Sequence, residues 1–509
     1  MGNDITRSDC DDVECGRGKV FRLPKMFREK RLKTQPVVCY SKSFAYLCSR
    51  FCDKKRVFSI GKVMERGYLH SVVRIVLVTL LGLLALHFLP VGLFGGAEVR
   101  EVDMLSDLRD STFVSDEEML DLDRAVAHHR IDSCRVGLEC INDMSGTADR
   151  GMEPLYRALD SLSTLGRPVR IAVLGDSYIE GDIFTAHLRE RMQTRWGGSG
   201  VGFVPMTDAI AGFRTTVRHR FGGWGSHHAN DPQSGYSNAL ANLTGHYFTG
   251  GAGAWVMLGG VGGDVAAHLD TCAQSSFYFM GHGSGEVAVS VNDGPERRLA
   301  LTGTGGVASV SVDGAIGSVK WRVTRSSGLT FLGASLDPTK GIIVDNFALR
   351  SSSGVQLSHI APRMFADFDT ARHYDLIVIM YGLNVAGRQT SKYEGYRETM
   401  TRAILAMSDA MPETGFLLVG STDREERAGG GFRTYRGVLS LINVQQQIAY
   451  DCHIAFWNLY KAMGGQGSVV TMVNNGEANK DYTHINFKGG RRLSGLLFDA
   501  IEWGVQTVE

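Results

Sequence analysis

The sequence lacks both a net charge and the residue spacings that bind metals. Its 54 Lys and Arg residues balance 54 Asp and Glu residues, and we expect no nucleic-acid partner. Cys48 and Cys52 have no second ligand pair, and His227, His228 and His246 lack the paired carboxylate or cysteine spacing of a metal site. No internal repeat is evident. We therefore expect no metal ion, and the chemistry inferred below requires no organic cofactor.

The balanced total hides two parts of opposite charge. Residues 1–74 contain 17 Lys and Arg against 8 Asp and Glu, and the remainder contains 37 against 46. Between them, Ile75 to Phe94 is uncharged and apolar apart from Thr79 and His87, and about 20 apolar residues are enough to span a bilayer. Because basic residues precede this run and acidic residues follow it, the charge bias places residues 1–74 in the cytoplasm. A buried core helix is the alternative interpretation of the run.

These features predict three N-terminal segments: a partly disordered basic tail over 1–74, a single transmembrane signal anchor over 75–95 and an acidic stalk over 96–150. The expected location is the cytoplasmic (inner) membrane, with the C-terminal part on the extracytoplasmic, periplasmic side. A start at Met64, which would favour cleavage, stays open, as does the role of the tail. Cys134 and Cys140 suit a local disulfide in an oxidising compartment, with free thiols the equal alternative.

The stretch from Ile171 to Asp182 predicts a strand that turns into a helix. An apolar run rich in β-branched residues ends at Gly175, and helical spacing follows from 183 to 196. Ser177 lies in the turn, where a parallel sheet exposes a side chain beside the free N–H groups of the next helix. A serine there can meet both a base and an anion-stabilising site. A helix cap is the ordinary alternative for a lone serine.

Alternating strands and helices return after Gly341 and predict an α/β domain with a parallel sheet, formed by 151–204 and 341–509. Further buried strands are expected at 375–380, 416–419 and 454–457, and helices at 392–408, 435–450 and 488–503. Residues 205–340 are instead rich in glycine and short alternating segments, which predicts an inserted β-sandwich. This module is a candidate for carbohydrate binding, although most of its aromatic residues are expected in its core.

Three polar groups follow elements whose ends can meet at one edge of that sheet: Ser177, Asn384 and the Asp481/His484 pair. In this Asp-x-x-His turn the carboxylate can accept a hydrogen bond from Nδ1–H of the histidine. That bond holds the tautomer whose Nε2 takes the serine proton. Asn384 offers a neutral N–H donor to a developing oxyanion. Together these residue types indicate acyl transfer through a serine nucleophile.

This set, in this order, resembles the SGNH (GDSL-type) hydrolase family. The matching blocks are Gly175-Asp176-Ser177, Gly382-Leu383-Asn384 and Asp481-Tyr482-Thr483-His484. The resemblance covers about 165–204 and 341–503 and implies a flavodoxin-like three-layer fold. It also implies that Ser177 is the nucleophile, His484 the general base and Asp481 its orienting carboxylate.

The same resemblance implies an oxyanion hole made by the backbone N–H of Ser177, a glycine N–H and the Asn384 amide. Gly354, at the end of the segment 345–354, is the glycine that matches best, and the glycines of 259–263 are the rival. Val385 stands where the family commonly has an aspartate, which leaves the amide donor intact.

A β-rich insertion between the first two blocks resembles the arrangement in bacterial peptidoglycan and polysaccharide O-acetylesterases. The resemblance implies a serine esterase that removes O-acetyl groups from an envelope glycan through an acyl-enzyme. An O-acetyltransferase with the same triad, a lipid esterase and a non-enzymatic envelope-glycan binding protein are the alternatives. The acyl group, the sugar and the oligomeric state are beyond the sequence.

Overall fold

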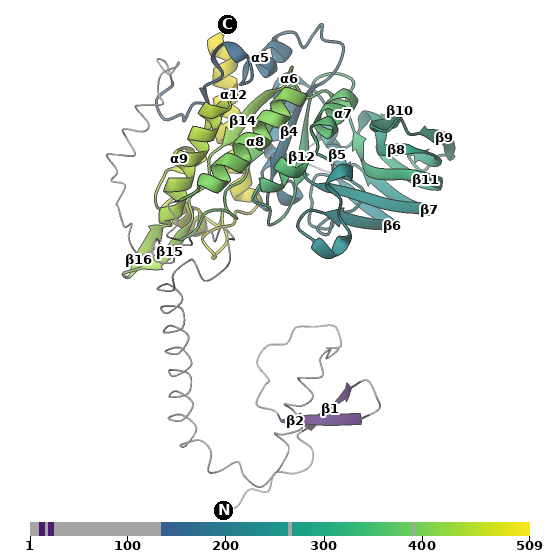
Figure 1. Ribbon diagram of the computed structural model, residues 1–509, viewed down its shortest axis with the longest axis horizontal. Coiled ribbons are helices and arrows are strands. Elements are labelled where there is room, and N and C mark those ends of the chain that lie inside the picture. The colour runs from purple at the N-terminus through teal and green to yellow at the C-terminus, as the bar shows by residue number, and fades with distance from the viewer. Residues whose placement is uncertain (1–9, 16–18, 25–133, 263–266, 389–391, 509) are drawn as a thin grey trace, which may run out of the picture. The chain divides into compact units, whose positions relative to one another are not determined.

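The computed structural model describes residues 10–15, 19–24, 134–262, 267–388 and 392–508 (Figure 1). The first two segments form an antiparallel hairpin of β1 (Cys10–Cys15) and β2 (Lys19–Pro24), in a compact unit separate from that of residues 113–509. The rest of the predicted tail, the predicted span over 75–95 and residues 96–133 lie outside the described residues. Within the described residues, no helix combines the length and apolar character needed to cross a bilayer.

The centre of the larger unit is a six-stranded sheet in the order β12-β4-β13-β14-β17-β3. Five strands are parallel and the short β3 is antiparallel to its neighbour. The strands are β3 (Asn142–Asp143), β4 (Val169–Gly175), β12 (Ile342–Ala348), β13 (Leu376–Met380), β14 (Gly415–Val419) and β17 (Ala455–Trp457). β13 and β14 are buried along their whole length, as parallel strands between helical layers must be. The predicted parallel α/β sheet is confirmed.

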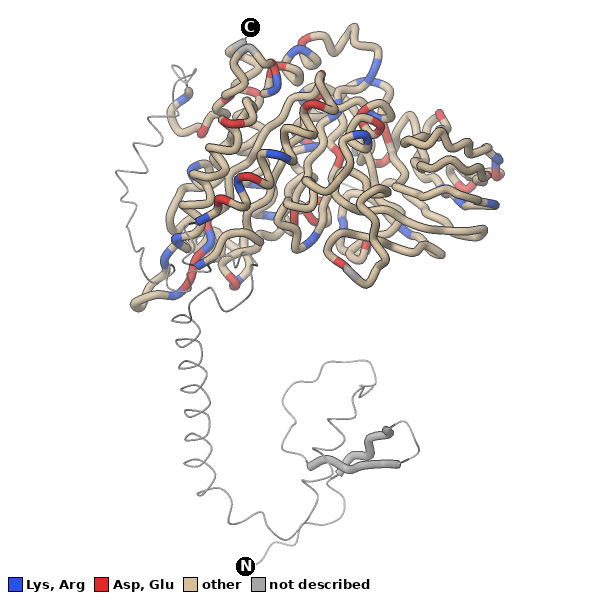
Figure 2. Tube along the Cα trace, in the orientation of Figure 1, with Lys and Arg blue, Asp and Glu red and all other residues tan. Residues whose placement is uncertain are grey.

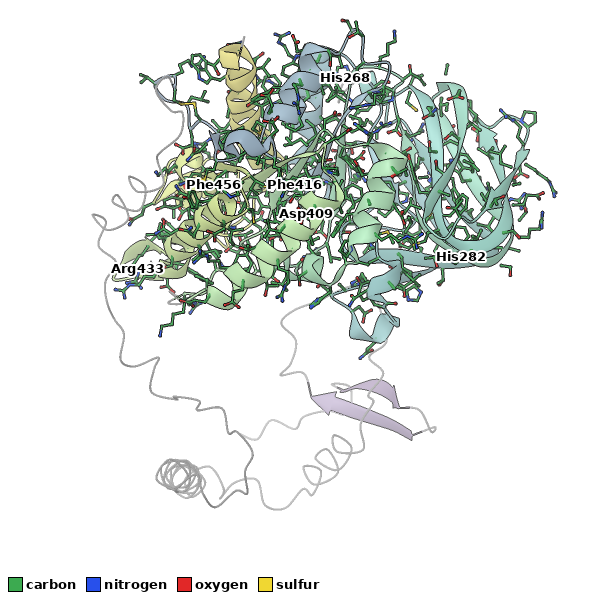
Figure 3. The ribbon with its side chains drawn as sticks, turned by 45° about the horizontal axis from the view of Figure 1, so that its top comes forward. His268, His282, Asp409, Phe416, Arg433 and Phe456 are labelled. Carbon is green, nitrogen blue, oxygen red and sulfur yellow. A yellow bond between two sulfur atoms is a disulfide. The ribbon has the colours of Figure 1, made fainter. Side chains whose placement is uncertain are left out.

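Helices cover both faces of this sheet (Figure 1). Because successive residues of a strand point to opposite faces, Ala172 and Leu174 pack with α7, α8 and α9, whereas Ile171 and Val173 pack with α5, α6 and α12. Phe416 and Phe456, labelled in Figure 3, belong to the first of these two cores. The long helices are α5 (Glu153–Asp160), α6 (Thr185–Trp196), α7 (Pro362–Arg372), α8 (Glu394–Ala410), α9 (Arg436–Asp451) and α12 (Phe487–Val508).

Short elements connect these layers. They comprise α10 (Leu459–Met463), α11 (Ser468–Asn474), the hairpin of β15 (Glu425–Ala428) and β16 (Gly431–Thr434), and the 3-10 helices η3 (Gly146–Ala148), η4 (Glu180–Asp182), η5 (Pro232–Ser234), η6 (Asn238–Leu240), η7 (Ala267–Leu269) and η8 (Val355–His359). Of these, η4 and η8 follow β4 and β12 at the same edge of the sheet.

The inserted module differs from the predicted two-sheet sandwich, because its strands form one hydrogen-bonded sheet of seven. The two longest strands have 20 and 19 residues and run through the whole module, bent at several β-bulges. The sheet encloses its own core, with Trp321 and Phe277 fully buried. Its strands are β5 (Gly202–Pro205), β6 (Arg218–His228), β7 (His246–Gly259), β8 (Cys272–Val291), β9 (Arg297–Thr302), β10 (Val307–Ile316) and β11 (Ser318–Leu336).

Arg372, the last residue of α7, joins the inserted sheet to the parallel sheet. Its buried guanidinium donates to Asp345 of β12 (Nε to Oδ2, 2.8 Å), to Asp337 after β11 (Nη1 to Oδ2, 3.0 Å) and to Tyr278 of β8 (2.7 Å). Burial lowers the pKa of Arg372, but the charges of Asp337 and Asp345 outweigh it and raise the pKa above its ordinary value. Elsewhere, charges of both signs are interspersed along the helices and strands (Figure 2).

The end of the predicted stalk belongs to the α/β unit instead. Cys134 and Cys140 form a disulfide, and β3 pairs with β17 at the edge of the sheet. The indole N–H of Trp457 donates to the main-chain oxygen of Glu139 at 3.0 Å. Residues 134–150 therefore pack against the parallel sheet, so the stalk as predicted over 96–150 extends too far into the folded unit.

Candidate active site

Three neighbouring strands end side by side at one edge of the parallel sheet. In the pairing register, Gly175 at the end of β4 lies opposite the last residues of β12 and β13. The loops that follow β12, β4 and β13 contain Gly354, Ser177 and Asn384 respectively. The structure therefore brings the predicted nucleophile and both predicted oxyanion-hole partners to the carboxyl edge of adjacent strands, where ligands bind in open α/β sheets.

Ser177 lies in the turn between β4 and η4, and the predicted helix begins two residues later than expected, at Thr185. Gly175, the last residue before this turn, lies close to the end of β13. A Cβ there would lie 2.8 Å from the Met380 main-chain oxygen, so only glycine fits at this position. Ser177 is partly exposed, whereas its neighbours Asp176 and Tyr178 are buried. An accessible hydroxyl on a turn anchored by buried neighbours suits a nucleophile.

The loop before α12 brings Asp481 and His484 together. Asp481 Oδ2 accepts a hydrogen bond from His484 Nδ1 at 2.7 Å, and Oδ1 accepts from the backbone N–H groups of Thr483 (3.1 Å) and His484 (3.0 Å). Burial raises the pKa of Asp481, but these N–H bonds and the charge of His484 outweigh it and leave the pKa below its ordinary value. The ionised carboxylate orients the ring through Nδ1 and leaves Nε2 for proton transfer.

Two observations relate the region of His484 to the serine turn. Gly490 of α12 packs against the residue that follows η4, where a Cβ would lie 1.8 Å from the Ile183 main-chain oxygen. Burial raises the pKa of both Asp176 and Glu180, and the charge of His484 acts against this at both carboxyls. Among the described residues no hydrogen bond joins Ser177 to His484 directly, as is common before substrate binds.

Asn384 is oriented by two acceptors. Its Nδ2 donates to Asp176 Oδ2 (3.1 Å) and to the Ser352 main-chain oxygen (2.9 Å). Asp176 also accepts from the backbone N–H of Tyr178 at 3.0 Å. Burial raises the pKa of Asp176 from its ordinary 3.8 to about 6, although the hydrogen bonds lower it. An oxyanion bound at Asn384 must replace one of its two acceptors. Asp176, which sequence reasoning treated only as part of a motif, is thus a positioning residue.

Gly354 precedes η8 with a left-handed φ of 89°. Its N–H donates to the Ser352 hydroxyl (3.0 Å), which in turn donates to Gln356 Oε1 (2.6 Å). A Cβ at Gly354 would lie 2.8 Å from the Tyr381 ring, so the backbone packs closely on that ring. Its N–H is bonded within its own loop, and its role as an oxyanion donor stays a prediction. The rival Gly259 lies at the end of β7 in the inserted sheet.

A cavity of about 450 Å³ opens beside Asn384. It lies between η8 and α8, and its lining includes Ser353, Val355, Tyr396 and Arg402. Apolar surface with a few polar groups is typical of small-molecule sites. The cavity provides room next to the candidate oxyanion hole for more than an acetyl group.

In the sequence, Glu425 and Glu426 stand beside Arg424 and Arg427, a pattern that predicts a solvated charge run. In the structure, Arg424 and Glu425 support the site instead. Glu425 is 4% exposed and accepts from the Gly467 N–H at 2.7 Å. Arg424 Nη1 donates to the main-chain oxygen of Leu383, the residue before Asn384, at 3.0 Å. The prediction was wrong for this pair because a run of charges does not reveal which side chains the loop turns inward.

From the sequence, Asp182 is expected to be a helix-start residue, because acidic groups are favoured in the first turn of a helix. In the structure it is the centre of a buried charge cluster. Its carboxylate accepts from Arg214 Nε (2.8 Å), Arg189 Nη1 (3.3 Å), Thr185 Oγ1 (2.6 Å) and Asn346 Nδ2 (2.9 Å). Burial raises the pKa of Asp182, but the charges of the two arginines outweigh it and the carboxylate stays ionised. No local sequence signal pairs Asp182 with Arg214 and Asn346, which lie 32 and 164 residues further along the chain.

The part of the chain that the structure describes contains no group of three or more His, Cys, Asp or Glu side chains placed to hold a metal ion. The candidate site contains serine, histidine, carboxylate and amide groups. Their arrangement can position a serine hydroxyl beside a base and an amide donor, which is the geometry of acyl transfer.

No family model and no curated protein matches the chain. A solved structure of a peptidoglycan O-acetylesterase matches with a TM-score of 0.60 and 23% identity over 72% of this chain and 99% of that one. A family two carbohydrate esterase from Clostridium thermocellum (TM-score 0.24, 11% identity, 50% and 93% covered) and an acetyl xylan esterase (TM-score 0.24, 14% identity, 31% and 80% covered) also match. The larger unit therefore has the fold of this peptidoglycan O-acetylesterase, and the resemblance to SGNH-type esterases inferred from the sequence is confirmed at the level of the fold.

Proposed function

We propose that the protein is a serine esterase of SGNH type that removes O-acetyl groups from an envelope glycan. One observation carries the proposal: Ser177 and Asn384 follow adjacent strands that end in register. The histidine proposed as their base has its Nδ1 2.7 Å from Asp481 Oδ2. The fold shared with a peptidoglycan O-acetylesterase supports the choice of substrate class. A fold alone does not define an activity, so the proposed reaction class depends on the geometry of the site.

The proposed reaction has two halves. Ser177 Oγ attacks the acetyl carbonyl carbon while His484 Nε2 takes the hydroxyl proton. The tetrahedral intermediate collapses, the sugar oxygen leaves with that proton, and an acetyl ester remains on Ser177. Water, deprotonated by His484, then attacks this ester and releases acetate. Asp481 stabilises the imidazolium through Nδ1, and the Asn384 amide with the N–H groups of Ser177 and Gly354 stabilises the oxyanion.

The proposed location is outside the cytoplasm, with the chain anchored in the inner membrane by residues 75–95. The disulfide between Cys134 and Cys140 supports this location, because disulfides persist in oxidising compartments and are rare in the cytosol. An envelope glycan would be accessible to an enzyme on that side of the membrane.

The test compares the full-length chain with its Ser177→Ala variant on O-acetylated peptidoglycan and measures released acetate. Release by the wild type and none above background by the variant is the expected result. Acetate release that survives the substitution contradicts the assignment of the nucleophile. In an assay with an added sugar acceptor, loss of acetyl groups from the polymer with acetylation of that sugar and no free acetate indicates transfer in place of hydrolysis.

A further inference from the structure

The side chain of Phe213 is exposed beside the candidate active site. It is 54% exposed, and among the described residues only Val136 and Tyr450 join it as exposed large hydrophobic residues. Single exposed apolar residues are common on protein surfaces. Exposure alone does not make Phe213 a binding residue, but the position of its ring and the contacts of its backbone distinguish it.

The ring lies between the elements that carry the nucleophile and the base. Gly181 belongs to η4, four residues after Ser177, and a Cβ on Gly181 would lie 3.3 Å from Phe213 Cδ1. On its other side, the Phe213 ring packs against Phe487, with 5.2 Å between centroids. Phe487 is the first residue of α12, three residues after His484. A ligand bound at the serine and histidine would have this ring as its neighbour.

The next residue in the chain holds the ring in position. Arg214 is buried and donates to Asp182 at 2.8 Å, and Asp182 immediately follows Gly181. The Phe213 N–H donates to the Ile210 main-chain oxygen at 2.7 Å. A buried ion pair thus fixes the backbone from which an exposed aromatic ring projects. A ring that is already positioned loses little conformational freedom when a ligand packs on it.

A charged residue, Glu180, precedes Gly181, the glycine that contacts this ring. Glu180 forms an ion pair with Arg350 at 3.0 Å. Burial raises the pKa of Glu180. The charges of Arg350, Asp208 and His484 also act on this carboxyl: Arg350 and His484 lower its pKa, and Asp208 raises it. These charged groups therefore lie near Glu180. A pyranose has an apolar face of C–H groups and an edge of hydroxyls. An aromatic ring flanked by carboxylates and a guanidinium matches both.

We propose that Phe213 binds the acetylated sugar by packing against the apolar face of its pyranose ring, with Glu180 and Arg350 in reach of the sugar hydroxyls. The proposal rests on the proposed esterase function and names the part of the site that selects a glycan over a small ester. Phe213 is a binding residue, and the proton transfers belong to other groups.

The test measures acetate release from O-acetylated peptidoglycan and from ethyl acetate, which has no ring to pack on Phe213. For Phe213→Ala we expect about a threefold to tenfold loss of kcat/KM on the glycan, mostly through KM, the range that an aromatic packing contact supplies. The same variant should hydrolyse ethyl acetate at the wild-type rate. Phe213→Trp should retain glycan activity.

Tyr450→Ala is the matched control, because Tyr450 is 50% exposed at the end of α9, which leads to the opposite, amino edge of the sheet. It should change neither activity. Equal losses on both substrates for Phe213→Ala, or no loss on either, would overturn the proposal while leaving the esterase intact. A wild type that releases acetate from neither substrate overturns the proposed function and this proposal with it.

Discussion

The buried carboxyl of Asp176 provides the most informative single substitution. Asp176 is 1% exposed, and burial raises its pKa from an ordinary 3.8 to about 6. Between pH 4 and 6 the folded state therefore holds a proton that the unfolded chain has lost, so stability falls as pH rises through this window. A shift of about two pKa units corresponds to about 3 kcal/mol at neutral pH. Asp176→Asn stays neutral at every pH and escapes this loss.

The asparagine has a separate, constant cost. Its single side-chain oxygen can accept from the Tyr178 N–H, but its amide nitrogen then faces the Asn384 amide in place of an acceptor. An unsatisfied buried donor costs about 1–3 kcal/mol. This cost does not depend on pH. Because the unfolded carboxyl is already more than half ionised at pH 4, the difference in unfolding free energy between variant and wild type should grow in the variant's favour by about 2 kcal/mol from pH 4 to pH 7.5.

Urea denaturation followed by tryptophan fluorescence at the two pH values measures this difference. Acetate release by the variant should meanwhile be slower, because Asn384 has lost one of the two acceptors that orient it. The largest expected decrease in kcat is about 10²–10³, the effect of removing an oxyanion donor altogether. Asp176→Asn should therefore become more stable relative to the wild type as the pH rises, and it should be less active. A stability difference that is the same at both pH values would refute the reasoning about Asp176.

Two further predictions concern charged pairs. Asp481→Asn should lower kcat by about 10⁴ with little change in KM, because the amide no longer holds the required tautomer of His484; steady-state acetate release within tenfold of the wild type contradicts the role of Asp481. Arg372→Met leaves Asp337 and Asp345 buried without their counter-charge and should cost about 3–5 kcal/mol in urea denaturation. Arg191→Met breaks the half-exposed pair with Asp499 and the cation–π contact with Phe498 and should cost about 1–2 kcal/mol, so a loss equal to that of Arg372→Met would contradict this account.

Strands and turns that depend only on neighbouring residues could be predicted from the sequence. The strands around 171–175, 376–380 and 416–419 are apolar runs, because a parallel sheet buries both faces. Ser177 and Asn384 follow such runs directly. Asp481 and His484 are three residues apart, so the turn that joins them is visible in the chain itself.

Features that depend on distant partners could not be predicted. Asp182 meets Arg214 and Asn346 only after the insertion has folded back on the parallel sheet. The module was expected to form two sheets, because short alternating segments do not reveal that β8 and β11 each continue through the whole module. The position of Phe213 likewise follows from the buried ion pair of its neighbour, and its own sequence context gives no signal.

The central claim is that Ser177 is a nucleophile activated by His484. The most direct measurement treats the full-length chain with a fluorophosphonate, which reacts with activated serines, and locates the modified residue by peptide mass spectrometry. We predict that the fluorophosphonate modifies Ser177 in the wild type. The corresponding peptide of Ser177→Ala should be unmodified, and His484→Ala should be modified much more slowly. Modification of a different serine, or an unmodified Ser177 in protein that still releases acetate, would contradict the account.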